Sequence, residues 1–402
     1  MKFFKNLRNV ILFIFSISTF SFTENKIQSI LTDTESLEAL NFSGLFSHPQ
    51  LGLSYTQLDS KELQKLQDYK HRLGSCAGYE LLSSNETYSE ATIEKLFNNF
   101  YLRDLEDRFD LRRKKSILKT KQSLNLLKKI SVEELKNSVK WISSYPTRYY
   151  DSKKPNEHVD DLYEKLKKWT KNSQLKTQVD YISHKGIRQK SLRLRIEGKK
   201  EASKIIALGA HFDSTNAYFS FNRNAPGADD NASGSAAILE VARVILANNS
   251  PSNKSIEFFW YAGEEGGLIG SSQIAENYNL ENKNVEAVLQ IDMASFSGSG
   301  DKTIANMTDY TSKWLRDFLE EINIHYSLGL KILYDKCGYG CSDHASWYRQ
   351  GFDTLMPSES LFNEINPHLH TNKDLINEQT NWTHLHDFTK IAMIFAQELA
   401  NN

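Results

Sequence analysis

The feature that most constrains the fold of this chain is a regular alternation of short apolar runs with helical segments, which begins near Ile130. Several of these runs carry hydrophobic residues at consecutive positions, as strands buried on both faces do. Strands that alternate with helices predict a mostly parallel sheet covered by helices on both sides. The predicted strands span residues 192–196, 204–210, 255–262 and 285–293, and the predicted helices span residues 132–143 and 233–248.

The predicted strands end in residue types that bind metal ions. Asp292 follows a mainly apolar run, where a carboxylate is costly to bury unless it is paired or bound to a metal. In open α/β sheets, ligands bind beyond the carboxyl ends of the strands, so we expect side chains from successive strand ends to meet. The candidates are His211, Asp213, Asp229, Asp230, Glu264, Glu265, Asp292 and His370.

Imidazole nitrogens and carboxylate oxygens are typical zinc ligands. Two zinc ions about 3.5–4 Å apart can share a carboxylate and a bridging water, which becomes a hydroxide nucleophile near neutral pH. A further carboxylate must stay free to take the proton and pass it to the leaving group. The adjacent Glu264 and Glu265 can supply one ligand and one such base. The pattern therefore favours a metal site.

Cys337 and Cys341 lie close together in the segment CGYGC. In an exported protein this spacing can close a small disulfide loop. Two free thiols and half of a metal site are the alternatives. Cys76 has no obvious partner.

The N-terminus has the pattern of a secretion signal. Lys2, Lys5 and Arg8 precede an apolar run at 10–22, which is shorter than the roughly 20 residues that cross a bilayer but suits a signal-peptide core. We predict a signal peptide at residues 1–23 and a secreted protein. The formal charge of the chain is −1, so we expect no nucleic-acid partner and, after signal removal, no membrane association.

The segment from residue 24 to 127 is polar and carries little recognisable chemistry. It contains two amphipathic stretches that predict helices, at 61–73 and 91–105, and a basic cluster at 112–115. An exposed basic cluster in a linker is a plausible protease target. A removable pro-segment is one interpretation, and a solvated helix face is the other.

From about residue 144 onward the chain resembles the secreted bacterial leucyl aminopeptidases, co-catalytic zinc exopeptidases related to glutaminyl cyclases. The matching segments are GAHFDST, APGADDNASG, YAGEEGGLIGS, LQIDM, CGYGCSDHASW and NPHLHTNKD. The resemblance implies a three-layer α/β/α sandwich with a mixed, mostly parallel central sheet, preceded by a helical pro-region. Residues 24–127 would form this pro-region and be removed, and residues 128–402 would form the catalytic domain.

The resemblance also implies two zinc ions per chain. His211 and Asp292 would hold one ion, and Glu265 and His370 would hold the other. Asp230 would bridge them, because it begins the Asp-x-x-Ser-Gly motif. The peptide bond after this aspartate would be cis. Cobalt or manganese could occupy such a site.

Other residues take catalytic roles by the same resemblance. Glu264 would be the general base, Asp213 would hydrogen-bond the first histidine ligand, and Tyr339 would help to stabilise the oxyanion. Cys337 and Cys341 would form a disulfide at the pocket wall. The remaining histidines of the region carry no motif of this kind, and we interpret them as structural or surface residues: His344, His368, His384 and His386.

The substrate pocket maps onto Met293, Met307, Phe362, Ile365 and the cysteine loop. Ser358 stands where a close relative has phenylalanine, and Ile365 replaces an aromatic residue. A hydrophobic pocket discriminates by only about 1–3 kcal/mol per methylene. We therefore expect a preference for bulky apolar first residues such as leucine, and no stricter selectivity.

Together these features predict a secreted, monomeric zinc aminopeptidase that acts on peptides with a free N-terminus. A glutaminyl cyclase-like enzyme with a single zinc ion is the first alternative. A catalytically inactive binding protein on the same scaffold is the second, although every predicted ligand and the base are present.

Overall fold

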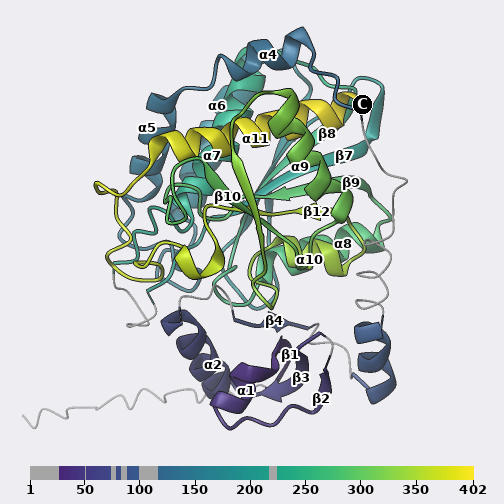
Figure 1. Ribbon diagram of the computed structural model, residues 1–402, viewed down its shortest axis with the longest axis vertical. Helices are drawn as coiled ribbons and strands as arrows, with labels where there is room; N and C mark the ends of the chain where they lie inside the picture. Colours follow the sequence, from purple (N-terminus) through teal and green to yellow (C-terminus); the bar gives the residue numbers. More distant parts are fainter. Residues whose placement is uncertain (1–26, 50, 74–77, 83–87, 99–115, 217–223) are drawn as a thin grey trace, which may run out of the picture.

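The computed structural model describes residues 27–49, 51–73, 78–82, 88–98, 116–216 and 224–402. The predicted signal peptide, the basic cluster at 112–115 and Cys76 lie outside these residues. Within the described ranges, none of the helices combines the length and apolar character needed to cross a membrane. A small N-terminal unit and a larger unit follow one another along the chain (Figure 1).

A mixed six-stranded sheet forms the middle layer of the larger unit. Its strands are β5 (Thr177–Ile182), β6 (Ser191–Ile196), β7 (Glu201–His211), β8 (Lys254–Tyr261), β9 (Asn284–Gln290) and β12 (Thr354–Leu355). The spatial order is β12-β9-β7-β8-β6-β5. Strands β12, β9, β7 and β8 are mutually parallel, and β6 runs antiparallel to its neighbours β8 and β5. The four predicted strands and the mixed, mostly parallel sheet are confirmed.

Helices cover both faces of this sheet. One face carries α4 (Lys121–Leu127), α5 (Val132–Ile142), α6 (Glu157–Asn172), α7 (Ala232–Ala247), α9 (Lys313–His325) and α11 (Trp382–Asn401). The other face carries α8 (Ile269–Leu280) and α10 (His344–Arg349). Figure 1 shows α8 and α10 on the side nearest the N-terminal unit and α11 on the opposite side.

The two-sided core explains the unbroken apolar runs. Along β7, Ile206 and Leu208 pack into the core beneath α7 and α11, whereas Ile205 and Ala207 face α8 and α10. Side chains of a strand alternate between faces, so a strand covered on both sides needs apolar residues at every position. This requirement makes the central strands recognisable in the sequence.

A second, three-stranded sheet of the larger unit was not predicted. It comprises β10 (Thr303–Met307), β11 (Lys331–Asp335) and β13 (Pro357–Ser358), in the order β11-β10-β13. The short helix η1 (Phe362–Glu364) follows it. β10 ends at Met307 and β13 ends at Ser358, so this sheet carries residues of the predicted pocket.

The N-terminal unit corrects the prediction of a helical pro-region. Its elements are β1 (Gln28–Asp33), α1 (Thr34–Ala39), β2 (Phe46–His48), β3 (Leu53–Leu58), α2 (Ser60–Arg72) and β4 (Glu80–Leu81). The strands form an antiparallel sheet in the order β2-β3-β1-β4. Its strands are short and mix polar with apolar residues. Their apolar side chains pack into two separate small cores. Leu31 and Tyr55 pack into one core, and Ile30 and Leu58 into the other.

The predicted helix at 61–73 is confirmed as α2. Asp59 accepts hydrogen bonds from the backbone N–H groups of Lys61 and Glu62, and the Glu62 side chain accepts one from Asp59, which forms a capping box. The second predicted helix, at 91–105, is helical at 91–98, and the rest of the predicted range lies outside the described residues.

The segment before α5 packs against the larger unit. The backbone N–H groups of Leu118 and Lys119 donate to the Glu398 carboxylate in α11. Leu126 and Ile130 are buried in the main core. The packing of the larger unit therefore includes residues 116–131.

Candidate metal centre

The candidate ligands converge because the strands that carry them are parallel neighbours. β7 ends at His211, β8 is followed by the adjacent Glu264 and Glu265, and β9 is followed by Asp292. Asp230 comes from the turn before α7, and His370 comes from the loop before α11. All of these side chains are at least 97% buried: His211, Asp230, Glu264, Glu265, Asp292 and His370.

Two groups of ligand atoms lie side by side. In the first, His211 Nε2 lies 2.9 Å from Asp230 Oδ1 and 3.1 Å from Asp292 Oδ1. In the second, His370 Nε2 lies 3.0 Å from Asp230 Oδ2 and 3.2 Å from Glu265 Oε2. The two oxygens of Asp230 thus face different histidines, and its carboxylate belongs to both groups.

The residues fit zinc. Ligand atoms about 2.0–2.1 Å from a tetrahedral zinc ion stand about 3.3 Å apart, close to the observed separations. Both carboxylate oxygens of Asp230 and Glu265, and both ring nitrogens of His370, are buried and make no hydrogen bond to the described part of the chain. Buried polar atoms are normally paired, and a bound cation would provide the partner that these atoms lack. The structure brings the five predicted ligands together as the resemblance implies.

His211 presents a bare nitrogen to the first group. Its Nδ1 lies 3.2 Å from the backbone oxygen of Asp213, which can only accept, so Nδ1 carries the proton and Nε2 is free to bind a metal. The predicted hydrogen bond between Asp213 and this ring is thus made by the Asp213 backbone oxygen and not by its carboxylate, whose Oδ1 lies 3.6 Å from Nδ1, too far for a hydrogen bond. The carboxylate instead accepts the backbone N–H groups of Glu264 and Glu265, at 3.1 and 3.2 Å.

Glu264 has the environment of a proton acceptor. Its two carboxylate oxygens are buried and accept no hydrogen bond from any described residue. Burial raises the pKa of Glu264 well above its usual value, and the nearby Asp292 carboxylate adds to this shift. A carboxylate of raised pKa holds and releases a proton more readily near neutral pH. A bound cation would lower the pKa again.

Two supporting residues hold the ligand groups in place, and sequence reasoning did not single them out. The Asp374 carboxylate accepts the backbone N–H groups of Asp229 and Asp230, both at 3.0 Å. The Ser342 hydroxyl donates to Asp292 Oδ2. Both lie within the segments quoted for the resemblance, NPHLHTNKD and CGYGCSDHASW, which is the signal that could have found them.

Arg148 is a third supporting residue, and no motif marks it. Its side chain is fully buried. The guanidinium donates to four backbone oxygens around the turn that leads to Asp230, those of Ile142, Phe212, Pro226 and Gly227. Burial lowers the pKa of Arg148 to about 10, so it keeps its charge at neutral pH.

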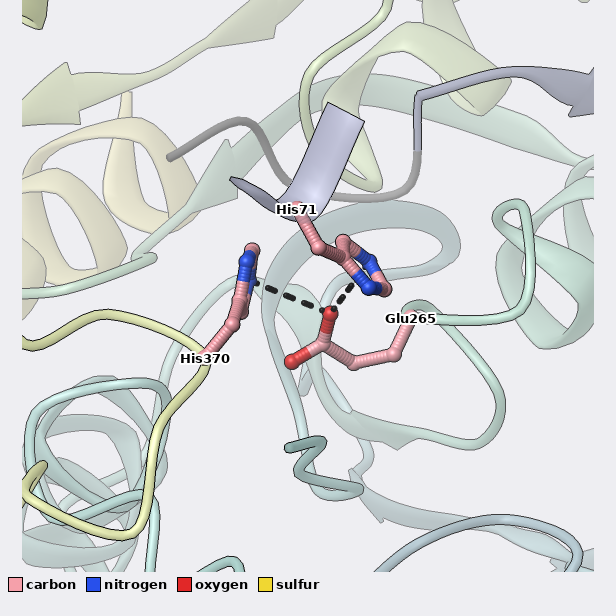
Figure 2. Close-up of side chains that lie close together, drawn as sticks. All are labelled: His71, Glu265 and His370. Atoms are coloured by element: carbon pink, nitrogen blue, oxygen red, sulfur yellow. Dashed lines mark ion pairs between the residues drawn. The ribbon is translucent and has the colours of Figure 1, made fainter. Parts of the chain in front are cut away.

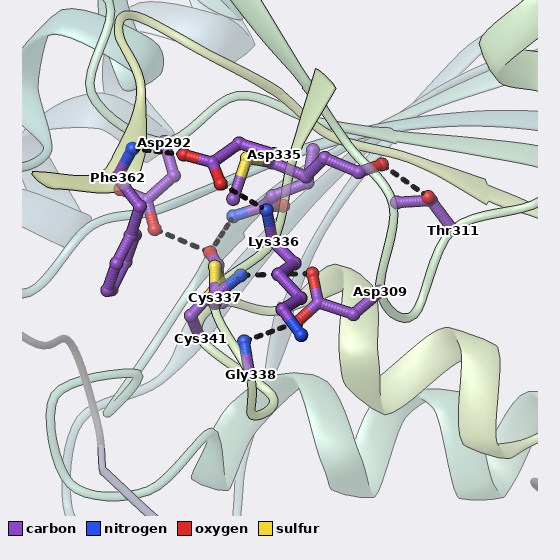
Figure 3. The surroundings of a disulfide bond; sticks show 12 residues. Asp292, Asp309, Thr311, Asp335, Lys336, Cys337, Gly338, Cys341 and Phe362 are labelled. Carbon is purple, nitrogen blue, oxygen red and sulfur yellow. Dashed lines mark hydrogen bonds between the residues drawn. A yellow bond between two sulfur atoms is a disulfide. The ribbon is translucent and has the colours of Figure 1, made fainter. Parts of the chain in front are cut away.

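The predicted disulfide between Cys337 and Cys341 is present (Figure 3). The Asp309 carboxylate accepts the backbone N–H groups of Cys337 and Gly338, at 3.2 and 2.6 Å, and anchors the loop. Tyr339, within this loop, is 96% buried. Its ring centroid lies 6.2 Å from that of Phe362.

The four predicted pocket residues fall into two hydrophobic clusters. Met307 and Phe362 cluster with Tyr339 and the disulfide. Met293 and Ile365 cluster with Leu369, which directly precedes His370. Met307 and Phe362 therefore pack against the cysteine loop, and Met293 and Ile365 pack beside the residue that precedes His370.

The Asp230–Asn231 peptide bond is cis, as the resemblance implies. Of the histidines interpreted as structural, His344 and His384 are buried and belong to none of the candidate ligand groups of the described residues, and His384 Nε2 lies 2.9 Å from the backbone oxygen of Glu359. One histidine that sequence reasoning missed does lie at the site. His71, at the end of α2, joins Glu265 and His370 in a third candidate group.

Fold and site define a metal-dependent enzyme on an α/β/α sandwich, and the comparisons agree. The chain is 35% identical over 293 residues to a protein described as a probable leucine aminopeptidase of Trichophyton verrucosum, an alignment that covers 71% of this chain and 77% of the relative. The crystal structure of the LapA aminopeptidase of Legionella pneumophila superposes with a TM-score of 0.79 at 26% identity, covering 94% of this chain and 99% of that one.

The profile of peptidase family M28 matches residues 192–396. The chain belongs to this family and is a hydrolase of the zinc aminopeptidase class. The sequence relatives include fungal proteins, so the resemblance extends beyond bacterial enzymes. A glutaminyl cyclase of Bacteroides thetaiotaomicron shares the fold, with a TM-score of 0.53 at 18% identity, covering 68% of this chain and 98% of that one.

Proposed function

We propose that the chain removes the first residue of peptides at a site that holds two zinc ions, with Glu264 as the general base. The observation that carries the proposal is the placement of Asp230, whose two oxygens lie 2.9 and 3.0 Å from the Nε2 atoms of two different histidines. Bound zinc polarises a scissile carbonyl and makes a nearby water more acidic.

The protein residues supply proton transfer and orientation. The Glu264 carboxylate, which no described residue engages in a hydrogen bond, accepts a proton from the attacking water and delivers it to the nitrogen of the leaving peptide. Asp213 sets the position of this carboxylate by holding the backbone N–H groups of Glu264 and Glu265. Tyr339 helps to stabilise the oxyanion that develops on the carbonyl oxygen.

The pocket groups point to an apolar first residue. Met293, Met307, Phe362 and Ile365 present carbon surfaces, and burial of such surface is favourable by roughly 25 cal/mol per Å². Several relatives are described as probable leucine aminopeptidases, which supports leucine as one preferred residue. Faster cleavage of lysine than of leucine substrates would refute this preference.

The setting of the enzyme is also a proposal. We infer a secreted monomer, made with a signal peptide at residues 1–23 and an N-terminal segment that is removed. The segment predicted at 24–127 would be cut near the basic cluster at 112–115, because residues 116–131 pack in the larger unit. Sequencing the N-terminus of the secreted protein tests both parts. A mature protein that starts near Glu24 refutes removal of the segment.

The test of the mechanism compares Glu264→Gln with Glu265→Gln. Both changes replace a carboxylate by an amide of the same shape. The first should keep both zinc ions and lose about 10²- to 10⁴-fold in kcat for leucine p-nitroanilide, whereas the second should also lose zinc. Metal analysis gives the stoichiometry.

The same measurements separate the alternatives. Two zinc ions per chain are expected for the aminopeptidase, and one would favour a cyclase-like enzyme. A chain that binds no metal and cleaves nothing would be an inactive scaffold. Undiminished turnover by Glu264→Gln would refute its role as base.

A further inference from the structure

The N-terminal unit docks on the larger unit beside the metal centre. Glu80 in β4 forms a buried ion pair with Arg349 in α10. The ring of Tyr79 lies against Gly267, where an added Cβ would come within 2.7 Å of the ring. Side chains of the small unit thus contact α10 and the loop between β8 and α8, which carries Glu264 and Glu265.

The side of α2 that faces the site carries polar residues. A helix face that is buried only for packing would carry apolar residues instead. Leu63 and Leu66 bury the first half of the helix in the small core. One turn further, Gln67, Lys70 and His71 continue the same face and are at least 95% buried. Buried polar groups need partners. Gln67 hydrogen-bonds to the larger unit, and Lys70 pairs with Asp33 of the small unit and also lies over the Tyr339 ring.

Each of the three contacts a predicted catalytic or ligand residue. The Gln67 side-chain amide donates to the backbone oxygen of Glu265. Lys70 Nζ lies 4.0 Å from the centroid of the Tyr339 ring. It also pairs with Asp33 at 2.6 Å, which fixes it within the small unit.

His71 points into the second ligand group (Figure 2). Its ring centroid lies 4.4 Å from that of His370, and its Nε2 lies 3.5 Å from Glu265 Oε2. The ring is 96% buried, yet Nε2 makes no hydrogen bond within the described residues. One ligand atom from each of the three residues lies within 4.8 Å of the others. Figure 2 shows the two rings and the carboxylate turned toward a common point.

We propose that His71 is a further ligand of the metal ion that Glu265 and His370 hold, and that the N-terminal unit thereby inhibits the full-length chain. The proposal rests on the proposed function, because it assigns a regulator to that site. A catalytic zinc ion keeps one position open for water or substrate. His71 would fill this position, while Lys70 covers the face of Tyr339.

The test uses the full-length chain with Co²⁺ in place of zinc, because the visible absorption of Co²⁺ reports its ligands. His71→Ala should change this spectrum. It should also raise kcat/KM for leucine p-nitroanilide by about tenfold or more, since an enzyme whose open state is populated to a tenth or less gains at least that factor when the block is removed. His48→Ala, in β2 of the same unit and packed near Phe97, is the matched control and should change neither.

A second variant guards against misfolding of the first. Gln67→Ala keeps the His71 imidazole and removes one docking contact, so it should raise kcat/KM in the same direction by a smaller factor. An unchanged Co²⁺ spectrum in His71→Ala overturns the ligand assignment, whatever the activity does. Unchanged kcat/KM in both variants overturns the inhibition. If no form of the chain cleaves the substrate, the proposed function fails, and the spectrum still decides whether His71 binds the metal.

Discussion

Replacing Asp213 by asparagine perturbs the ligand groups without touching a ligand. The carboxylate accepts the backbone N–H groups of two consecutive residues, Glu264 and Glu265, at 3.1 and 3.2 Å. Asparagine has the same shape but one acceptor oxygen, so one of the two N–H groups would face an NH₂ group in a fully buried position. We expect the peptide that carries the base and a ligand to shift.

The cost follows from these bonds. A hydrogen bond to a charged group contributes about 1.5–3 kcal/mol, and a buried unsatisfied donor costs about 1–3 kcal/mol. Both distances are longer than the 2.7–2.9 Å of strong charge-assisted bonds, so the low end of each range applies. The sum is about 2–3 kcal/mol, which corresponds to about 30- to 150-fold in kcat/KM.

The assay measures kcat/KM with leucine p-nitroanilide at saturating zinc, together with zinc affinity by competition with a chromogenic chelator. Zinc affinity should fall about 10- to 100-fold, as for other residues that support metal ligands. The control is Asp151→Asn, a surface aspartate in an exposed ion pair with Arg188, which should change neither value appreciably. If Asp213→Asn keeps kcat/KM within threefold and binds zinc normally, the reasoning is wrong.

Three further predictions concern stability. Chelation of the metal should lower the melting temperature by at least about 5 °C in calorimetry, because it leaves buried carboxylates such as Asp230 uncompensated; an unchanged melting temperature would contradict this. Arg148→Met should lower the free energy of unfolding in urea by about 3–5 kcal/mol, since four buried backbone oxygens lose the guanidinium and, among the described residues, only that of Gly227 keeps another donor, the Ala232 N–H. A loss below about 1 kcal/mol would count against the role given to Arg148. His184 is held neutral, with its Nε2 accepting the backbone N–H of Ser191, and burial lowers its pKa from 6.5 to about 4. Neutral His184 therefore contributes stability that is fully present above pH 6.5 and is lost as the pH falls toward 4, at most about 3 kcal/mol. His184→Asn should flatten this part of the curve of unfolding free energy against pH. An unaltered slope would refute the role of His184.

The central sheet and the ligand groups were predictable because both leave a local signal. A strand buried on both faces needs consecutive apolar residues, as at Ile205 to Leu208. Parallel strands bring their carboxyl ends to one edge, so His211 and Asp292 meet although 81 residues separate them. The motif spacing then distinguishes Asp230 from Asp229.

What the sequence did not predict depends on contacts between distant segments. Arg148 is one basic residue among many until the fold places four carbonyl oxygens around it. His71 lies in an ordinary amphipathic helix, and its position at the metal centre follows from how the N-terminal unit docks. The small sheet of that unit was not predicted. Its strands contribute apolar side chains to two cores, so polar and apolar residues do not alternate regularly along them.

The position of bound zinc tests the central claim most directly. Crystals of the full-length protein grown with zinc should give two anomalous peaks at the zinc absorption edge, about 3.5–4 Å apart. One should lie between His211 and Asp292, the other between His370 and Glu265, with the Asp230 carboxylate between the two. A single peak, or two peaks that do not share Asp230, would contradict the two-metal account.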